Sequence, residues 1–431
     1  MPTFEAAEAF ARVERGILAH LPSTGPALAA TLAADPEFAL AHAVQGLGAL
    51  SLARTTLRPV AAAALANAKA CSAIDARAAD FIAALEAWNA GGMRAAATRL
   101  EARMAADPGD ALAFKLAHSI RFMAGDLPGM LRASSAAARH FPADAPGGSF
   151  VLGCHAFALE EAGDYAAAEA VGLAAVEADP ADAWGLHAVG HVYEMTGQAK
   201  RGADWLEKTQ PDWQNCNNFG LHVAWHLALF RLELGEGDAA LALYDAAVRA
   251  TPSDEYRDVA NAVSLLVRLE QAGIGVGARW AELGAHANRF ADDGELVFAM
   301  LHRLLAAARA GEPVAAAAIA GQIAACAARD DDQGRAAARV GVPLAASLLD
   351  RAPAGADIGA LLAALPEIGG SHAQRDLFVR ALAHDAFLRG DWTAVRRILA
   401  CRNRNRMPDR FNQRLQQRRA APAPVDFRVQ R

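Results

Sequence analysis

Apolar segments of helical period alternate along the chain with short polar turns that contain proline or glycine. Proline-centred turns recur at Pro36, Pro108, Pro142, Pro180 and Pro252. Their separations are 72, 34, 38 and 72 residues, and Pro211 divides the last interval near its middle. A unit of this length with two helices is typical of tetratricopeptide-like repeats. The pattern therefore predicts an all-α helical-repeat superhelix (an α-solenoid) over residues 1–400, with a concave ligand-binding surface.

Glycine and aspartate mark the turns between the predicted helices of a unit. In "EEAGDYAAAEA", Gly163 is expected to end one helix and Asp164 to begin the next. The same device recurs in "ELGEGDAALAL" around Gly235, Gly237 and Asp238, and again in "FLRGDWTAVRR" near the C-terminus.

Composition narrows the class of protein further. Hydrophobic residues make up 54% of the chain, with alanine and leucine well ahead of the residues that strands prefer. A formal charge of -6 and a pI near 6.1 provide no general attraction to nucleic acid or anionic lipid. The five cysteines are widely spaced and form no Cys-x-x-Cys, and no apolar run reaches the length of a membrane span. We expect a cytoplasmic protein that does not enter a membrane.

Residues 401–431 form an arginine-rich C-terminal segment. The segment holds nine arginines against Asp409 and Asp426, and therefore carries +7 while the rest of the chain carries -13. With Pro422 and Pro424 and few apolar residues, it is predicted to be a solvated, partly disordered tail. Binding of RNA or of a membrane surface by this tail is the alternative.

Two histidine pairs carry the clearest chemical signal. In "WGLHAVGHVYEMTG", His187, His191 and Glu194 recur at steps of four and three, and "FGLHVAWHLALF" places His222 and His226 four apart. Such steps stack side chains on one face of a helix. The short loop "KTQPDWQNCNNFG" is expected to join the two histidine-bearing helices so that the pairs face each other.

Facing histidine pairs can bind a metal ion, because neutral imidazoles are ligands of iron, zinc, copper and manganese. His187, His191, His222 and His226 are the predicted ligands, and Glu194 is a further ligand or a proton-transfer group. Haem held by histidine is a variant, although no Cys-x-x-Cys-His would attach it covalently. The alternative is that these histidines make structural hydrogen bonds in a helical core.

Other residues are candidates for lining a pocket beside these histidines. His155 lies in the preceding repeat, and Tyr193 and Trp225 could form pocket walls. Near the C-terminus, "GGSHAQRDLF" combines a helix cap with polar side chains, and a helix start offers free N–H groups to an anion. There Ser371, Gln374, Arg375 and Asp376 are expected to orient substrate or water. His302 and His372 are further histidines whose membership of the site the sequence leaves open.

Four segments in order, "HAVGHVYEMTGQAKRGADWL", "HVAWHLALFRLELGEGDAALALYD", "SLLVRLEQAG" and "GGSHAQRDLF", resemble the tetratricopeptide repeat protein 38 family, which includes StaR-like bacterial members. The resemblance covers most of the chain. It implies a helical-repeat fold and a hydroxylase role, with family histidines at His155, the two pairs and His302, and the polar run at 371–376. This chain departs from the family pattern at Asn261 and Met300, where the family has Asp.

The sequence thus predicts a metal-dependent enzyme, with iron as the expected metal and an oxygenase or hydroxylase reaction on a small-molecule substrate. A non-catalytic repeat scaffold that binds a protein or peptide partner is the first alternative. A metal-dependent hydrolase, active with redox-inert zinc, is the second. Exposed ends of a repeat stack often pair, so a homodimer also remains open.

Overall fold

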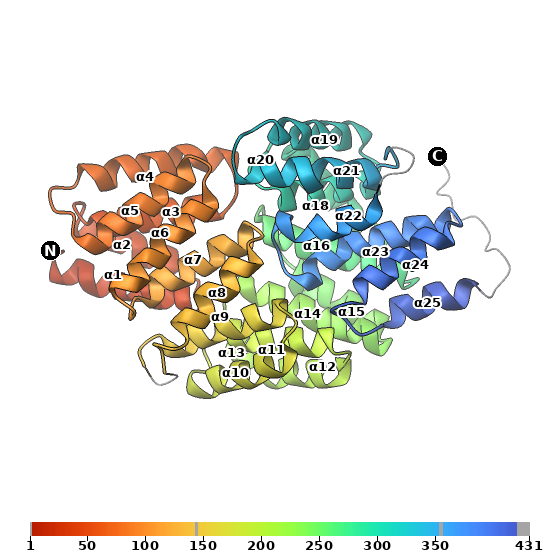
Figure 1. Ribbon diagram of the computed structural model, residues 1–431, viewed down its shortest axis with the longest axis horizontal. Coiled ribbons are helices and arrows are strands. Elements are labelled where there is room, and N and C mark those ends of the chain that lie inside the picture. Colours follow the sequence, from red (N-terminus) through yellow and green to blue (C-terminus); the bar gives the residue numbers. More distant parts are fainter. Residues whose placement is uncertain (1, 143–144, 353–356, 420–431) are drawn as a thin grey trace.

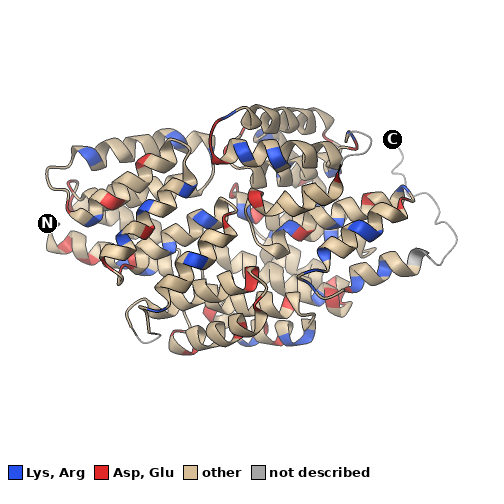
Figure 2. Cartoon of the chain, viewed as in Figure 1, with Lys and Arg blue, Asp and Glu red and all other residues tan. Residues whose placement is uncertain are grey.

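The structure, a computed structural model, describes residues 2–142, 145–352 and 357–419. These residues form helices that pack in sequence-adjacent pairs, and no strand occurs among them (Figure 1). The predicted all-α helical-repeat fold is therefore confirmed. Figure 2 shows that charges of both signs are interspersed along the helices, with basic residues on the last of them.

The first half of the chain contains α1 (Phe4–Leu18), α2 (Thr24–Ala34), α3 (Ala39–Ser51), α4 (Arg58–Ala70), α5 (Ala76–Asn89), α6 (Met93–Ala106), α7 (Ala111–Met123), α8 (Leu127–Ala137), α9 (Gly148–Glu161), α10 (Tyr165–Ala178), α11 (Ala183–Met195), α12 (Ala199–Lys208) and α13 (Gln210–Trp213). The second half contains α14 (Asn218–Leu234), α15 (Gly237–Leu243), α16 (Tyr256–Gln271), α17 (Arg279–Arg289), α18 (Val297–Ala310), α19 (Pro313–Ala327), α20 (Asp332–Ala336), α21 (Val342–Leu348), α22 (Ile358–Ala364), α23 (His372–Leu388), α24 (Trp392–Arg402) and α25 (Arg410–Arg419). Short helical turns of other pitch are η1 (Thr55–Leu57), η2 (Tyr244–Val248), η3 (Ala337–Gly341) and η4 (Leu365–Ile368).

The predicted turns form where glycine and aspartate were expected. Gly163 has φ of +86°, and the Asp164 side chain accepts a hydrogen bond from the N–H of Ala167 to begin α10. Gly235 ends α14 in the left-handed region with φ of +89°. Asp238 lies in the first turn of α15 rather than at its cap, because that helix already begins at Gly237.

The two histidine-bearing helices are α11 and α14. The loop at residues 208–220 does not join them directly, because α12 lies between them in the chain and packs against both. His187 and His222 are 35 residues apart, about one repeat, so α11 and α14 are equivalent helices of neighbouring repeats. The histidine pairs face each other because neighbouring repeats stack. The prediction that a short loop joins the two helices directly is therefore wrong.

The stack curves until distant repeats meet around a central cavity. The N–H of Asn217 donates to the carbonyl of His20 at 2.7 Å, and the Thr55 hydroxyl donates to Asp293 at 3.1 Å. Figure 1 accordingly shows the N-terminal helices beside both the middle of the chain and α20. Helices from the N-terminal, middle and C-terminal parts of the chain therefore line one cavity.

The predicted boundary at residue 400 falls inside α24. Arg402 is buried and donates to Asp376 at 2.6 Å and 2.9 Å, so α24 and α23 are joined by a buried ion pair. The remaining part of the predicted tail, residues 420–431, lies outside the described residues. In the described ranges, no helix is both long and apolar enough to span a membrane.

Candidate metal centre

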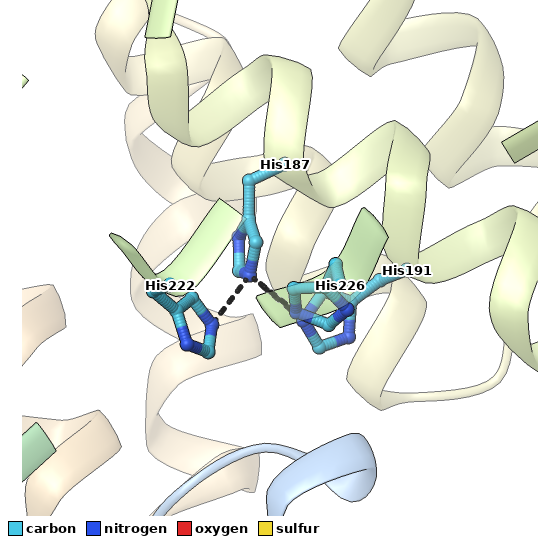
Figure 3. A group of neighbouring side chains, drawn as sticks. All are labelled: His187, His191, His222 and His226. Atoms are coloured by element: carbon cyan, nitrogen blue, oxygen red, sulfur yellow. Dashed lines mark hydrogen bonds between the residues drawn. The ribbon is translucent and has the colours of Figure 1, made fainter. Parts of the chain in front are cut away.

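Helices α11 and α14 bring four imidazoles to one point (Figure 3). Nε2 of His187 lies 3.0 Å from Nε2 of His222, 3.2 Å from that of His226 and 2.9 Å from that of His191. The four nitrogens lie within 4.8 Å of one another. The sequence prediction that these histidines come together is therefore confirmed in its geometry.

The local sequence explains why these side chains are held firmly. Every residue of α11 is buried, which makes it an inner helix of the stack. Asp182 caps the start of α11, where its side chain accepts from the N–H of Gly185, and Asn217 caps the start of α14, where it accepts from the N–H of Phe219. The four-residue step then places both histidines of each helix on one face.

The other ring nitrogen of three of the histidines faces an oxygen atom. Nδ1 of His226 lies 3.0 Å from Oε2 of Glu194, and Nδ1 of His222 lies 2.9 Å from Oδ1 of Asn261. Nδ1 of His191 lies 3.5 Å from Oε2 of Glu160. Carboxylate and amide carbonyl oxygens accept hydrogen bonds, so the contacts of His226 and His222 favour a proton on Nδ1 of these two rings. Nε2 of His222 and Nε2 of His226 are then each left with a lone pair, whereas Nδ1 of His187 is buried without a hydrogen-bond partner among the described residues.

Lone pairs that converge at hydrogen-bond distance repel one another unless a positive charge lies between them. Outer oxygens that orient the imidazoles of a metal site in this way are the usual accompaniment of histidine ligands. The arrangement is therefore complementary to a metal cation. With a proton on Nε2, His187 would instead donate to a neighbouring imidazole, which is the alternative of structural hydrogen bonding.

Burial keeps the imidazoles of His187, His191 and His222 neutral. Removal from water, together with the neighbouring histidines, lowers the pKa of His187 and of His191 well below the ordinary value of 6.5. Burial, followed by the charge of His226, lowers the pKa of His222 to about 3. Metal binding needs the unprotonated imidazole, so these three histidines are able to bind a metal ion at neutral pH.

Glu194 is placed behind His226 rather than among the Nε2 atoms. Its Oε1 accepts from Nη2 of Arg406 at 2.9 Å while Oε2 contacts His226. Burial alone would raise the pKa of Glu194, but Arg406 and His226 outweigh it and hold the pKa below the ordinary value. The carboxylate is therefore ionised, and it contacts the four-histidine cluster at Nδ1 of His226.

A buried acidic pair lies on the other side of His191. Glu160, Glu161 and His191 offer ligand atoms within 4.8 Å of one another. Oε2 of Glu161 accepts from Arg375 at 2.9 Å, and its Oε1 accepts from the N–H of His372. Both oxygens of Glu160 are buried without a hydrogen-bond partner among the described residues, and burial raises the pKa of this carboxyl well above 4.5.

Some of the predicted pocket residues do reach the site. The Trp225 ring stacks on His222 with ring centroids 5.2 Å apart. Ser371 and Gln374 form a reciprocal capping box at the start of α23, and both line the cavity beside His187. Arg375 does not line the cavity, and it reaches the site only through its ion pair with Glu161.

Other predicted residues lie elsewhere. His155 makes its contact with the Ser134 hydroxyl of α8 at 3.1 Å, and the Tyr193 hydroxyl donates to Glu169 on α10. Asp376 accepts from Arg402 in a buried ion network. His302 is buried against Phe298, with its Nδ1 2.7 Å from that residue's carbonyl oxygen. The structure thus places His155, Tyr193, Asp376 and His302 outside the four-histidine cluster.

A cavity of about 330 Å³ adjoins the four histidines, and His187 and His222 form part of its wall. Its size is at the lower end of the range for small-molecule pockets. Sequence reasoning missed Glu160 and Arg406 as partners of the histidine helices, and it noted Asn261 only as a departure from a family pattern. No protein-family model matches the chain.

Proposed function

We propose that this protein is a metal-dependent oxygenase or hydroxylase that uses iron to act on a small molecule in the central cavity. The observation that supports the proposal is the convergence of four Nε2 atoms at the edge of a 330 Å³ cavity. Membership in the tetratricopeptide repeat protein 38 family forms part of the proposal and rests on the order of the four sequence motifs.

The number of imidazoles favours a metal with more than four coordination positions. A zinc ion held tetrahedrally by all four would have no position left for water or substrate. Non-haem iron accepts imidazole and keeps open positions in enzymes that use oxygen. Open positions on the side of His187 and His222 would face the cavity.

Residues around the histidines would orient the iron ligands and exclude water from the site. Glu194 and Asn261 fix the orientation of His226 and His222 and keep the proton on Nδ1. Trp225 packs against both imidazoles and is fully buried, so it excludes water from that side. Bound iron would supply the redox chemistry, and the cavity would present the substrate to it.

Elemental analysis of protein purified without an affinity tag tests the proposal. Wild type is expected to contain about one equivalent of iron after anaerobic reconstitution, and a His191→Ala, His222→Ala double variant is expected to lose it. The matched control is a His118→Ala, His302→Ala double variant, which removes two buried histidines outside the cluster and should keep the metal. Circular dichroism checks that each variant folds.

The outcomes separate the three functions that the sequence left open. Iron lost only in the cluster variant, with oxygen uptake, supports the oxygenase. Zinc in the same place and no response to iron would replace it with the hydrolase. No metal in any variant after reconstitution would overturn the metalloenzyme and leave the repeat scaffold.

A further inference from the structure

The central cavity combines apolar walls with a cationic group. Its apolar lining comes from helices far apart in the chain and includes Leu28, Phe122 and Phe298. Lys115 and Arg257 also line it, whereas none of the described residues around it is Asp or Glu. The cavity therefore presents positive charge and no negative charge to whatever occupies it.

Lys115, on α7, carries the charge that the protein leaves uncompensated. The residue is 2% exposed, and its ammonium lies 3.7 Å from Sγ of Cys154 and 4.5 Å from the ring centroid of Trp184. No carboxylate of the described residues lies within 4.0 Å of this ammonium. A buried ammonium normally has an anionic partner, because an isolated charge is costly to remove from water.

Asp182 is an acidic residue whose charge interacts with that of Lys115, but its side chain caps a helix. Its Oδ1 accepts from the N–H of Gly185 at 3.0 Å and begins α11. Burial raises the pKa of Asp182 to about 7 despite the opposing effect of Lys115, so this carboxyl is only partly ionised at neutral pH.

Arg257, by contrast, is already paired. Nη1 lies 3.3 Å from Oε2 of Glu255, and Nη2 donates to the carbonyl of Ser51 at 2.8 Å. Among the described residues, the cavity therefore has one cation without a carboxylate within 4.0 Å, which matches a single negative charge better than a dianion such as a phosphate ester.

We infer that the cavity binds a small apolar molecule with one carboxylate, which pairs with Lys115 while the apolar body extends toward His187 and His222. The ammonium lies 4.5 Å from the Trp184 ring centroid, which is 5.4 Å from that of His187. One aromatic ring thus separates the anchored carboxylate from the metal centre. The reaction at this carboxylic acid rests on the proposed function, whereas its binding needs no metal.

Isothermal titration calorimetry on the full metal-free chain tests this inference. The probes are 4-phenylbutanoate and octanoate, each compared with the alcohol of the same carbon skeleton and with the corresponding amine. A charge-assisted hydrogen bond in a buried site predicts that each acid binds about 10- to 100-fold more tightly than its alcohol. The amines should bind more weakly than the alcohols, since their charge has the sign of Lys115.

The decisive variant is Lys115→Met, which keeps an unbranched side chain and removes the ammonium. It should bind acid and alcohol about equally, while retained binding of the alcohol shows that the cavity is intact. Lys115→Arg should keep the preference for acid. Ser119→Ala is the matched control, because Ser119 lines the same cavity but carries no charge and only donates to the backbone carbonyl of Lys115.

Equal binding of acid and alcohol by wild type, or a preference for acid that survives Lys115→Met, would overturn the inference. The absence of saturable binding by either acid would overturn it as well. Because the titrations use metal-free protein, an absent metal centre would leave these results unchanged. Failure of the proposed function and failure of this inference are therefore separate outcomes.

Discussion

Replacing Glu194 by Gln tests the contact that orients His226 in the candidate metal centre. The carboxylate uses one oxygen for Nδ1 of His226 at 3.0 Å and the other for Nη2 of Arg406 at 2.9 Å. These two donors face different oxygens, and an amide replaces one of the oxygens by NH2, so one donor loses its acceptor. If its NH2 group faces His226 instead, Nδ1 must accept, the proton moves to Nε2, and that nitrogen ceases to be a ligand.

The expected loss of metal affinity follows from the role of residues that hydrogen-bond to the ligands of a metal site. Loss of such a carboxylate lowers metal affinity about 10- to 100-fold, which corresponds to about 1.4 to 2.8 kcal/mol of binding free energy. The fold should tolerate the change, because Arg406 still lies near Asp376 and Asp409, at 3.8 Å and 3.7 Å. Weaker binding without loss of folding is therefore the predicted signature.

Titration with Co²⁺, followed by its visible absorption in competition with a chelator, measures the affinity. Glu169→Gln is the matched control, because Glu169 bonds Tyr193 and Arg201 and makes no contact with the four histidines. The same affinity in Glu194→Gln and wild type would refute the reasoning that Glu194 holds His226. A changed Co²⁺ spectrum with a far larger loss would instead make Glu194 a direct ligand.

Three further predictions concern stability and can be checked by urea unfolding. Burial lowers the pKa of His118 to about 3. Below about pH 6.5 the unfolded chain therefore binds a proton that the folded chain does not, and the free energy of unfolding decreases as the pH is lowered. His118→Phe should therefore lessen the fall between about pH 6.5 and about pH 5 by roughly 1.4 kcal/mol per pH unit, and an unchanged slope would contradict this. Gly202→Ala should cost about 1 to 3 kcal/mol, because a Cβ there would press on the buried Phe230 ring, whereas Gly321→Ala in open space on α19 should add about 0.5 to 1 kcal/mol. Arg402→Ala should cost about 3 to 5 kcal/mol by leaving two buried carboxylates without their main cation, and a loss below about 1 kcal/mol would show that the network is dispensable.

Local features of the sequence were sufficient to predict the helices and their turns. Helical period, alanine content and the Gly163-Asp164 type of boundary act within a few residues, so they can be identified without knowledge of the fold. The four-residue steps of the histidine pairs belong to the same class, because a single helix already puts both side chains on one face. The offset of 35 residues between His187 and His222 matches the repeat length and was the available sign that the pairs would meet.

Only the tertiary structure decided what surrounds these histidines. Asn261 reaches His222 from a helix 39 residues further along, and Arg406 reaches Glu194 across 212 residues. The separation of Lys115 from a compensating carboxylate likewise depends on which helices line the cavity. Local propensities specify each helix, whereas the curvature that accumulates over many repeats determines which distant side chains meet inside the superhelix. The sequence alone therefore determined the helices and the pairing of the histidines, and the closure of the stack decided their outer partners, their burial and the charge of the cavity beside them.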